Sequence, residues 1–158
     1  MKRSNNLNIS FEDMYNVNRP TLGRQADIVI TRILKYALID YLGFNSASKI
    51  YFAGRYVGEN CNVKTMDEMK ELFMELGIGI LDVVDEDPLK IRVTECIGCS
   101  GLPNVGQSVC FFEAGIIAGC LNNILNEDVK VTETKCHAMG DDYCEFEVHD
   151  IQPSSDLN

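Results

Sequence analysis

The C-terminal third of the chain carries side chains that bind soft metal ions. Glu133 continues the inward-facing side of a predicted strand that begins near Val129, and Cys144 begins the inward-facing side of the next strand. Cys136 starts the loop between the two strands, where Gly140 allows a tight turn. A lone buried carboxylate is costly, so two thiols and a carboxylate at one turn predict a metal site.

Spacing alone does not identify a fourth ligand for this site. Four further cysteines precede the hairpin and are candidates: Cys96, Cys99, Cys110 and Cys120. His137, next to Cys136, is an alternative to Glu133 as a ligand, although a histidine in a loop is more often simply exposed. The alternative to a metal site is a buried cluster of thiols, because reduced cysteines also pack as small apolar residues.

Cys96 and Cys99 form a C-x-x-C pair that has to be interpreted separately. The pair is a candidate second metal half-site, a redox pair or a switchable thiol. A thioredoxin-like pair would join a strand to a helix, whereas here a Gly/Pro/Asn-rich loop separates the pair from the next predicted helix. We therefore expect packing or loop structure first. Cys61 and Cys120 have no partner at a recognisable spacing and are predicted to be core residues.

Helical spacing of apolar residues dominates the first half of the chain. An amphipathic helix is predicted from Leu22 to Leu42, and a second helix begins near Ser46. Thr65 and Glu68 form a capping box, which predicts the start of a third, short helix. The chain up to residue 20 is polar without a sustained period and is predicted to be an arm.

The second half of the chain alternates with a period of two, apart from one apolar helix. Residues 78–94 predict an antiparallel hairpin, residues 107–125 a buried helix, and residues 129–148 the last hairpin. The predicted fold class is α+β: N-terminal helices packed on an antiparallel β-sheet, with a further buried helix before the metal-bearing hairpin. The expected divisions are an N-terminal arm at 1–20, one domain at 21–150 and a polar tail at 151–158.

Small residues give two of the predicted helices a flat face. Gly54 and Gly58 lie four apart in the second helix and predict a close helix contact. The buried helix has a similar face, formed by Ala114, Gly115, Ala118 and Gly119. This second face either lets another helix approach or leaves space for a ligand.

Composition excludes several classes of partner. The formal net charge of -10 disfavours nucleic acid and anionic membranes, which are bound by clustered Lys and Arg. No apolar run is long enough to span a bilayer, and the first residues do not resemble a signal peptide, so we expect a cytoplasmic protein with reduced cysteines. Nucleotide-binding and nucleophile-elbow motifs are absent, which makes an enzyme the less favoured interpretation.

One extended motif resembles that of a known family. Cys110-x3-Ala-Gly-x3-Gly119, followed by Val-x-Val-x-Glu133-x2-Cys136-x3-Gly140-Asp-x2-Cys144-x-Phe146, is similar to the signature of the 4-vinyl-reductase-like domain family. In sensor domains of this family that respond to aromatic compounds, zinc is bound by a Cys, then Glu-x2-Cys, then a Cys eight residues further on. The resemblance implies a zinc ion held by four residues: Cys110, Glu133, Cys136 and Cys144. A four-coordinate site of this kind is closed to reactive water and would be structural.

The same resemblance implies a ligand-binding function. The fold of the family is similar to that of TRAPP vesicle-tethering subunits and, more distantly, of haem-based nitric-oxide sensors, all of which enclose a hydrophobic cavity. We therefore expect a homodimer that binds a small apolar or aromatic ligand between the helices containing Ile33 and Phe111 and the strand Leu89 to Val93. The alternatives are a reductase acting on a vinyl group and a TRAPP-like adaptor or assembly subunit. The chain has no Trp, a residue that the aromatic sensors use in the phenol pocket.

Overall fold

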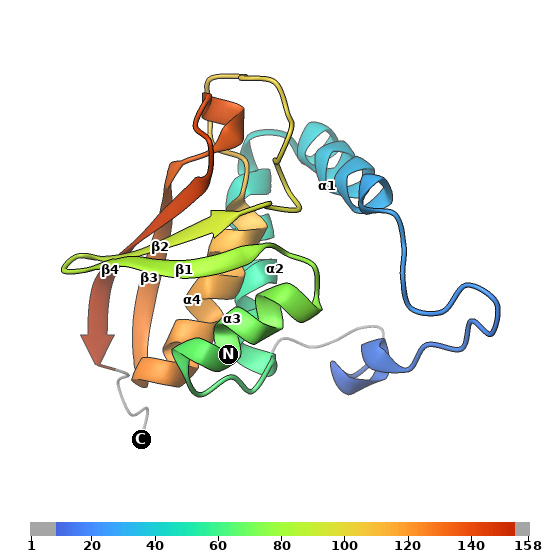
Figure 1. Ribbon diagram of the computed structural model, residues 1–158, viewed down its shortest axis with the longest axis horizontal. Helices are drawn as coiled ribbons and strands as arrows, with labels where there is room; N and C mark the ends of the chain where they lie inside the picture. The colour runs from blue at the N-terminus through green and yellow to red at the C-terminus, as the bar shows by residue number, and fades with distance from the viewer. Residues whose placement is uncertain (1–8, 154–158) are drawn as a thin grey trace.

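The computed structural model describes residues 9–153 of the chain (Figure 1). Its helices are α1 (Ile28–Leu42), α2 (Ser46–Asn60), α3 (Met66–Glu75) and α4 (Phe111–Leu125). Its strands are β1 (Ile80–Glu86), β2 (Leu89–Thr94), β3 (Glu127–Lys135) and β4 (Cys144–Pro153), and single 3-10 turns are η1 (Glu12–Tyr15), η2 (Gly43–Asn45) and η3 (His137–Met139). The predicted α+β class, with helices and an antiparallel sheet, is confirmed.

The sheet has the strand order β1-β2-β4-β3, and every neighbouring pair is antiparallel. The two predicted hairpins, β1–β2 and β3–β4, therefore meet along β2 and β4. In this register Val93 lies opposite Cys144, and Phe146 lies opposite both Ile91 and Glu133. The pairing brings the end of β2 and the start of β4 to the same end of the sheet.

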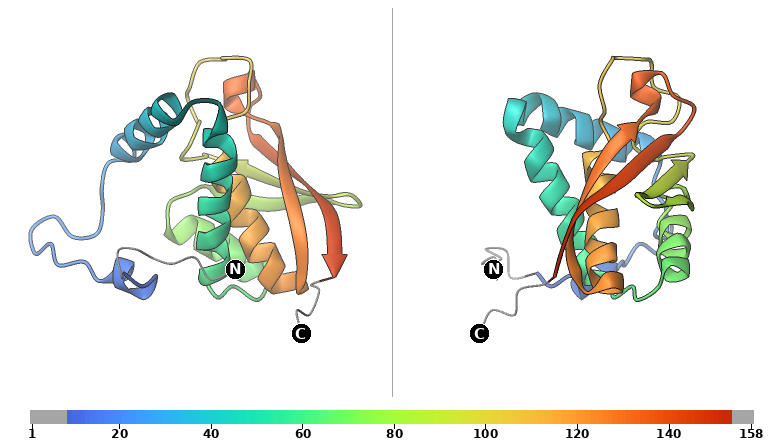
Figure 2. Two further views of the ribbon diagram at one scale, coloured as in Figure 1. Left: turned by 180° about the vertical axis from the view of Figure 1, so that it is seen from behind. Right: turned by 90° about the vertical axis from the view of Figure 1, so that its left-hand side faces the viewer.

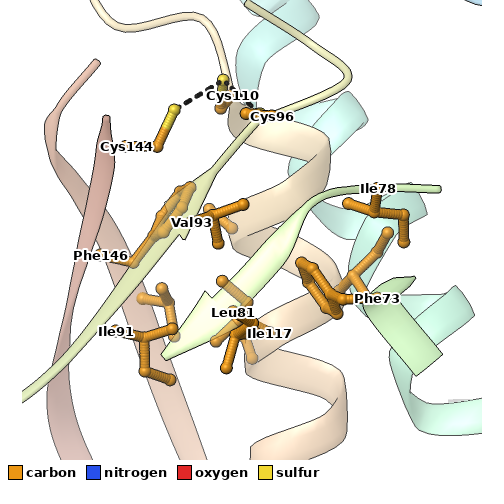
Figure 3. Packing of buried hydrophobic residues seen from close by; sticks show 14 of the residues in the cluster. Phe73, Ile78, Leu81, Ile91, Val93, Cys96, Cys110, Ile117, Cys144 and Phe146 are labelled. Carbon is orange, nitrogen blue, oxygen red and sulfur yellow. Dashed lines mark hydrogen bonds between the residues drawn. The ribbon is translucent and has the colours of Figure 1, made fainter. Parts of the chain in front are cut away.

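Helix α4 lies between the sheet and α2, and α3 lies beside β1 (Figures 1 and 2). Every residue from Glu113 to Leu121 is buried, because this helix is apolar on all sides. Phe73, Ile117 and Phe146 fill the space between α3, α4 and the sheet (Figure 3).

Helices α2 and α4 contact each other through glycine. A Cβ atom added at Gly54 would overlap the backbone oxygen of Phe112, and one added at Gly115 would overlap that of Tyr51. The close helix contact predicted from Gly54 and Gly58 is confirmed. The small face of α4 is used in the same contact, so this part of α4 receives a helix rather than a ligand.

Helix α1 begins later than predicted and leaves its apolar residues uncovered. Asp27 caps it, with Oδ1 accepting a hydrogen bond of 2.9 Å from the Val29 N–H, so the helix starts at Ile28 rather than Leu22. None of its residues is buried, and the exposed ones include Ile33 and Tyr41. Its apolar residues are therefore not covered by the part of the chain that the structure describes.

The ends of the chain extend away from this core. Residues 9–27 are exposed except for half-buried Phe11, whose ring centroid lies 6.2 Å from that of Tyr56 on α2. Residues 1–8 of the predicted arm and 154–158 of the predicted tail lie outside the described residues, and β4 continues to Pro153. Among residues 9–153, no helix is both long and apolar enough to cross a membrane.

Candidate metal centre and apolar groove

Five buried cysteines gather at the end of the sheet where β2 ends and β4 begins. Cys110 precedes α4 and lies between Cys96 and Cys144 (Figure 3). Together with one carboxylate, the cysteines form two groups of four in which all ligand-type atoms lie within 4.8 Å of one another. One group is Cys110, Glu133, Cys136 and Cys144, and the other is Cys96, Cys99, Cys110 and Cys144.

The first group is the one implied by the sequence motif, and its geometry fits a tetrahedral zinc ion. Cys110 Sγ lies 3.9 Å from Cys136 Sγ and 3.8 Å from Cys144 Sγ. Two sulfurs bound at about 2.3 Å to a tetrahedral zinc lie about 3.8 Å apart. Glu133 Oε2 accepts a hydrogen bond of 2.9 Å from the Cys110 N–H. Glu133 Oε1 is buried among the thiols without a hydrogen-bond partner in residues 9–153, and a cation there would supply one.

The protonation of this group also suits a cation. Burial raises the pKa of the Glu133 carboxyl to about 8, although the Cys110 N–H opposes the shift. Hydrogen bonding with Cys136 raises the pKa of the Cys110 thiol, and the same interaction lowers the pKa of Cys136, so the two share a thiol and a thiolate. A bound metal ion would displace the remaining protons.

The loop between β3 and β4 turns around Cys136, as its glycine predicted. Gly140 has a φ of 95°, in the left-handed region that favours glycine. The Cys136 N–H donates to Asp141 Oδ2 at 2.9 Å, and the Asp141 N–H donates back to the Cys136 oxygen at 3.1 Å. His137 is half-buried in this loop and is a member of neither group.

The C-x-x-C pair is the part of the cluster that spacing left open. Cys96 Sγ lies 3.6 Å from Cys110 Sγ, and Cys99 Sγ lies 3.1 Å from Cys144 Sγ. Cys120 is buried and its thiol donates to the Gly58 oxygen on α2 at 3.8 Å, so it is the core residue that was predicted. Cys61 is only half-buried.

A groove of about 440 Å³ lies between α1 and the rest of the domain. Its walls are mostly apolar side chains: Leu34, Leu38, Ile50, Ala53, Val57, Leu76, Ile78, Ile97, Phe112 and Ile116. The predicted helices containing Ile33 and Phe111 do form walls, but the predicted strand Leu89 to Val93 does not. That part of the prediction was wrong, because Ile91 and Val93 are fully buried in the core beside α4.

A buried ion pair lies at one wall of the groove. Lys35 Nζ on α1 is 3.0 Å from Glu113 Oε2 on α4, and their side chains are only 10% and 2% exposed. Burial raises the pKa of Glu113, whereas burial of Lys35 is outweighed by Glu113, which raises the pKa of Lys35. Gly98 lies against this pair, since a Cβ atom there would overlap Glu113 Oε1. A charged residue within an apolar helix was the only sequence signal of this pair.

The comparisons with known proteins bear on the region that carries the cluster. The profile of the vinyl-4-reductase (V-4-R) domain matches residues 89–150. The uncharacterized protein MJ1642 of Methanocaldococcus jannaschii is 40% identical over 128 residues, which is 80% of each chain. The chain belongs to the vinyl-4-reductase domain family. The resemblance inferred from the motif Cys110 to Phe146 is thereby confirmed.

Solved structures share the fold of this vinyl-4-reductase domain. A vinyl-4-reductase family protein from Methanocaldococcus jannaschii has a TM-score of 0.67 at 23% identity, covering 83% of this chain and 85% of its own. The phenol-responsive sensory domain of the transcription activator PoxR, solved with phenol, has a TM-score of 0.56 at 14% identity, covering 78% and 74%. Trafficking protein particle complex subunit 3 from Naegleria fowleri, covalently bound to palmitic acid, has a TM-score of 0.57 at 13% identity, covering 80% and 98%.

Proposed function

We propose that this vinyl-4-reductase domain binds a small apolar or aromatic molecule in the groove between α1 and α2, and that a structural zinc ion holds the neighbouring loops. The observation that carries the proposal is the groove itself, whose walls are almost entirely apolar and whose volume is about 440 Å³. Pockets that bind small molecules have volumes of roughly 300–1,000 Å³ and few polar groups.

Two proteins of similar fold support a ligand of this chemistry. The PoxR sensory domain was solved with phenol, and the trafficking complex subunit is bound to palmitic acid. Both molecules combine an apolar body with one polar end. The groove here offers the same contrast, with Leu34, Leu38 and Ile50 along its walls and Arg32 and Lys35 among its polar groups.

The zinc ion is proposed at Cys110, Glu133, Cys136 and Cys144. Four protein ligands would complete a tetrahedral site, so no position would remain for substrate or reactive water. The chemistry that the ion supplies when bound is cross-linking, because its ligands come from the start of α4, from β3, from the loop after it and from β4.

A homodimer is proposed through α1. The side of this helix away from the groove carries Val29, Ile30, Ile33 and Tyr41, all of them exposed. The preceding arm is also exposed and carries Met14 and Val17, so helix and arm together form a continuous apolar surface. A second copy of the chain would cover such a surface, with each arm lying on the partner.

Light scattering tests the dimer. The wild type should have about twice the chain mass at micromolar concentration, and Ile33→Asp should reduce it to the mass of one chain. Asp40→Asn on the same helix serves as the control and should leave the dimer intact. A wild type that stays monomeric would contradict the dimer without affecting ligand binding.

Thermal unfolding with phenol and with palmitic acid tests ligand binding. A ligand at about a hundred times its dissociation constant should add roughly 2.7 kcal/mol to the stability of the folded protein. Ala53→Trp fills the groove from α2 and should abolish the shift. Ser48→Trp, on the same helix outside the groove, should retain it. If neither compound raises the wild-type midpoint, the proposed function fails for these ligand classes.

A further inference from the structure

The two groups of ligand atoms at the cluster are not independent, because they share Cys110 and Cys144. The first group adds Glu133 and Cys136 to the shared pair, and the second adds Cys96 and Cys99. Each group contains four atoms within 4.8 Å of one another, which is the number that a tetrahedral ion needs. Two tetrahedra that share two corners share one edge.

The shared edge has the length that thiolates bridging two ions require. Cys110 Sγ and Cys144 Sγ are 3.8 Å apart, which matches the separation of about 3.8 Å between two sulfurs bound to one tetrahedral zinc. On the second side, Cys96 Sγ lies 3.6 Å from Cys110 Sγ. Cys99 Sγ lies nearer to Cys144 Sγ, at 3.1 Å, and would move outward to admit an ion.

The C-x-x-C loop is held in place from outside the cluster. Arg32 on α1 donates from Nε to the Ile97 oxygen at 2.6 Å and from Nη2 to the Ser100 oxygen at 2.9 Å. Tyr36, one turn further along α1, donates its hydroxyl to the Gly98 oxygen at 2.8 Å. These bonds orient the loop so that both of its thiols point into the cluster, where they are fully buried.

We propose that the cluster is a binuclear metal centre in which Cys110 and Cys144 bridge two zinc ions. One ion takes Glu133 and Cys136 as its remaining ligands, and the second takes Cys96 and Cys99. The second ion displaces the protons that Cys96 and Cys99 otherwise carry. This centre extends the single structural zinc of the proposed function and does not depend on any ligand in the groove.

The charges at the centre are compatible with two ions. Five thiolates and one carboxylate carry six negative charges, of which two divalent ions neutralise four. The start of α4, which Cys110 caps, directs its positive end toward the cluster. Lys35 also interacts electrostatically with Cys110. All six ligands come from protein side chains, so each ion has four ligands without water.

Metal counting on the full chain tests the proposal. Native mass spectrometry and elemental analysis of the wild type loaded with excess zinc and then desalted should give two zinc ions per chain, one for each group. Cys96→Ser and Cys99→Ser should each reduce the count to one and leave the fold, followed by circular dichroism, intact. Cys120→Ser, which removes a buried thiol outside the cluster, should keep both ions. A wild type that binds one ion overturns the binuclear centre whatever the variants do.

Cobalt(II) substitution distinguishes bridged ions from two separate ones. In the bridged centre the second cobalt should couple to the first through the shared thiolates, so the electron paramagnetic resonance signal should fall as the second equivalent binds. In the Cys96→Ser/Cys99→Ser double variant the signal of the single cobalt should persist. Two cobalt signals that simply add would contradict bridging, and acid-labile sulfide in protein purified without oxygen would replace the proposal with an iron–sulfur cluster. Failure of ligand binding is measured separately by thermal unfolding.

Discussion

The carboxylate of Glu133 shows how one side chain can serve both the fold and a metal. Its Oε2 holds the backbone of Cys110 at the start of α4, while Oε1 is left among the thiols. A cation at the cluster would satisfy the second oxygen without disturbing the first. The two functions can be separated by substitution, because glutamine keeps an oxygen acceptor but loses the charge.

Glu133→Gln is therefore expected to weaken zinc binding less than Cys136→Ser does. A carboxylate is the harder and weaker ligand for zinc, whereas loss of a thiolate removes a soft ligand that zinc prefers. Competition with a chromophoric chelator measures both affinities. Asp82→Asn, an exposed change on β1, is the matched control and should have no effect. Equal losses from Glu133→Gln and Cys136→Ser would contradict this ranking.

The ion pair of Lys35 and Glu113 gives a second prediction for single residues. Lys35→Met leaves a buried carboxylate without its partner and should destabilise the protein by about 3–5 kcal/mol at neutral pH. Because burial raises the pKa of Glu113, the lone carboxyl takes up a proton as the pH falls, and the loss should shrink on acidification. Chemical denaturation at several pH values measures this dependence. The double variant Lys35→Met/Glu113→Gln should recover most of the stability, and equal losses in single and double variants would contradict the account.

Among the elements, α2 and α4 have the closest contact. Gly54 and Gly58 on one helix face Gly115 and Gly119 on the other, and side chains at any of these positions would meet backbone atoms. Backbone atoms cannot move aside as a flexible side chain can. The helix pair therefore provides a fixed wall for the groove, while α1 supplies the opposite wall.

Gly115→Ala is expected to destabilise the protein by about 1–3 kcal/mol, because its Cβ must displace the Tyr51 backbone. Urea denaturation measures the change. Ser48→Ala, on the exposed side of α2, should change stability by less than about 0.5 kcal/mol. An unchanged midpoint for Gly115→Ala would show that the two helices separate more easily than their packing implies.

Local pattern predicted these elements well, but it did not predict their partners. The capping box of Thr65 and Glu68 gave the start of α3, and the alternation of Val129, Val131 and Glu133 gave the inward side of β3. Both signals lie within a few residues. The approach of Cys96 and Cys99 to the cluster depends on the pairing of β2 with β4, which no local pattern encodes.

For α1 the same limit has a different cause. Its helical period was correctly recognised, and that period implied a buried face for Ile33 and Leu34. Both residues are exposed, because the groove lies on one side of α1 and no part of residues 9–153 covers the other. A sequence pattern identifies an apolar face but does not identify what covers it.

In the whole molecule, the region that matches the family profile and the region that forms the groove are different. Residues 89–150 contain every ligand-type atom of the cluster, whereas the groove also needs α1, α2 and the start of β1. The two parts meet at the C-x-x-C loop, where Ile97 and Gly98 line the groove and Cys96 and Cys99 enter the cluster.

Removal of the metal should consequently loosen one part of the molecule before the rest. Chelator-treated protein is expected to lose hydrogen-exchange protection in residues 96–110 and 133–144, whose side chains converge on the cluster. The contact of α2 with Ala114–Leu121 should keep its protection, because it depends on helix packing. Uniform loss of protection across the chain would indicate that the metal holds the entire fold together.

The grip of α1 on the C-x-x-C loop has a thermodynamic consequence. Arg32 and Tyr36 hold the backbone of that loop, and the same helix forms a wall of the groove, so occupants of groove and cluster act on one shared segment. Binding linkage is reciprocal: a ligand that changes the affinity for metal by some factor must have its own affinity changed by the same factor when the metal binds. A domain built in this way can report the availability of zinc through its ligand, and of its ligand through zinc.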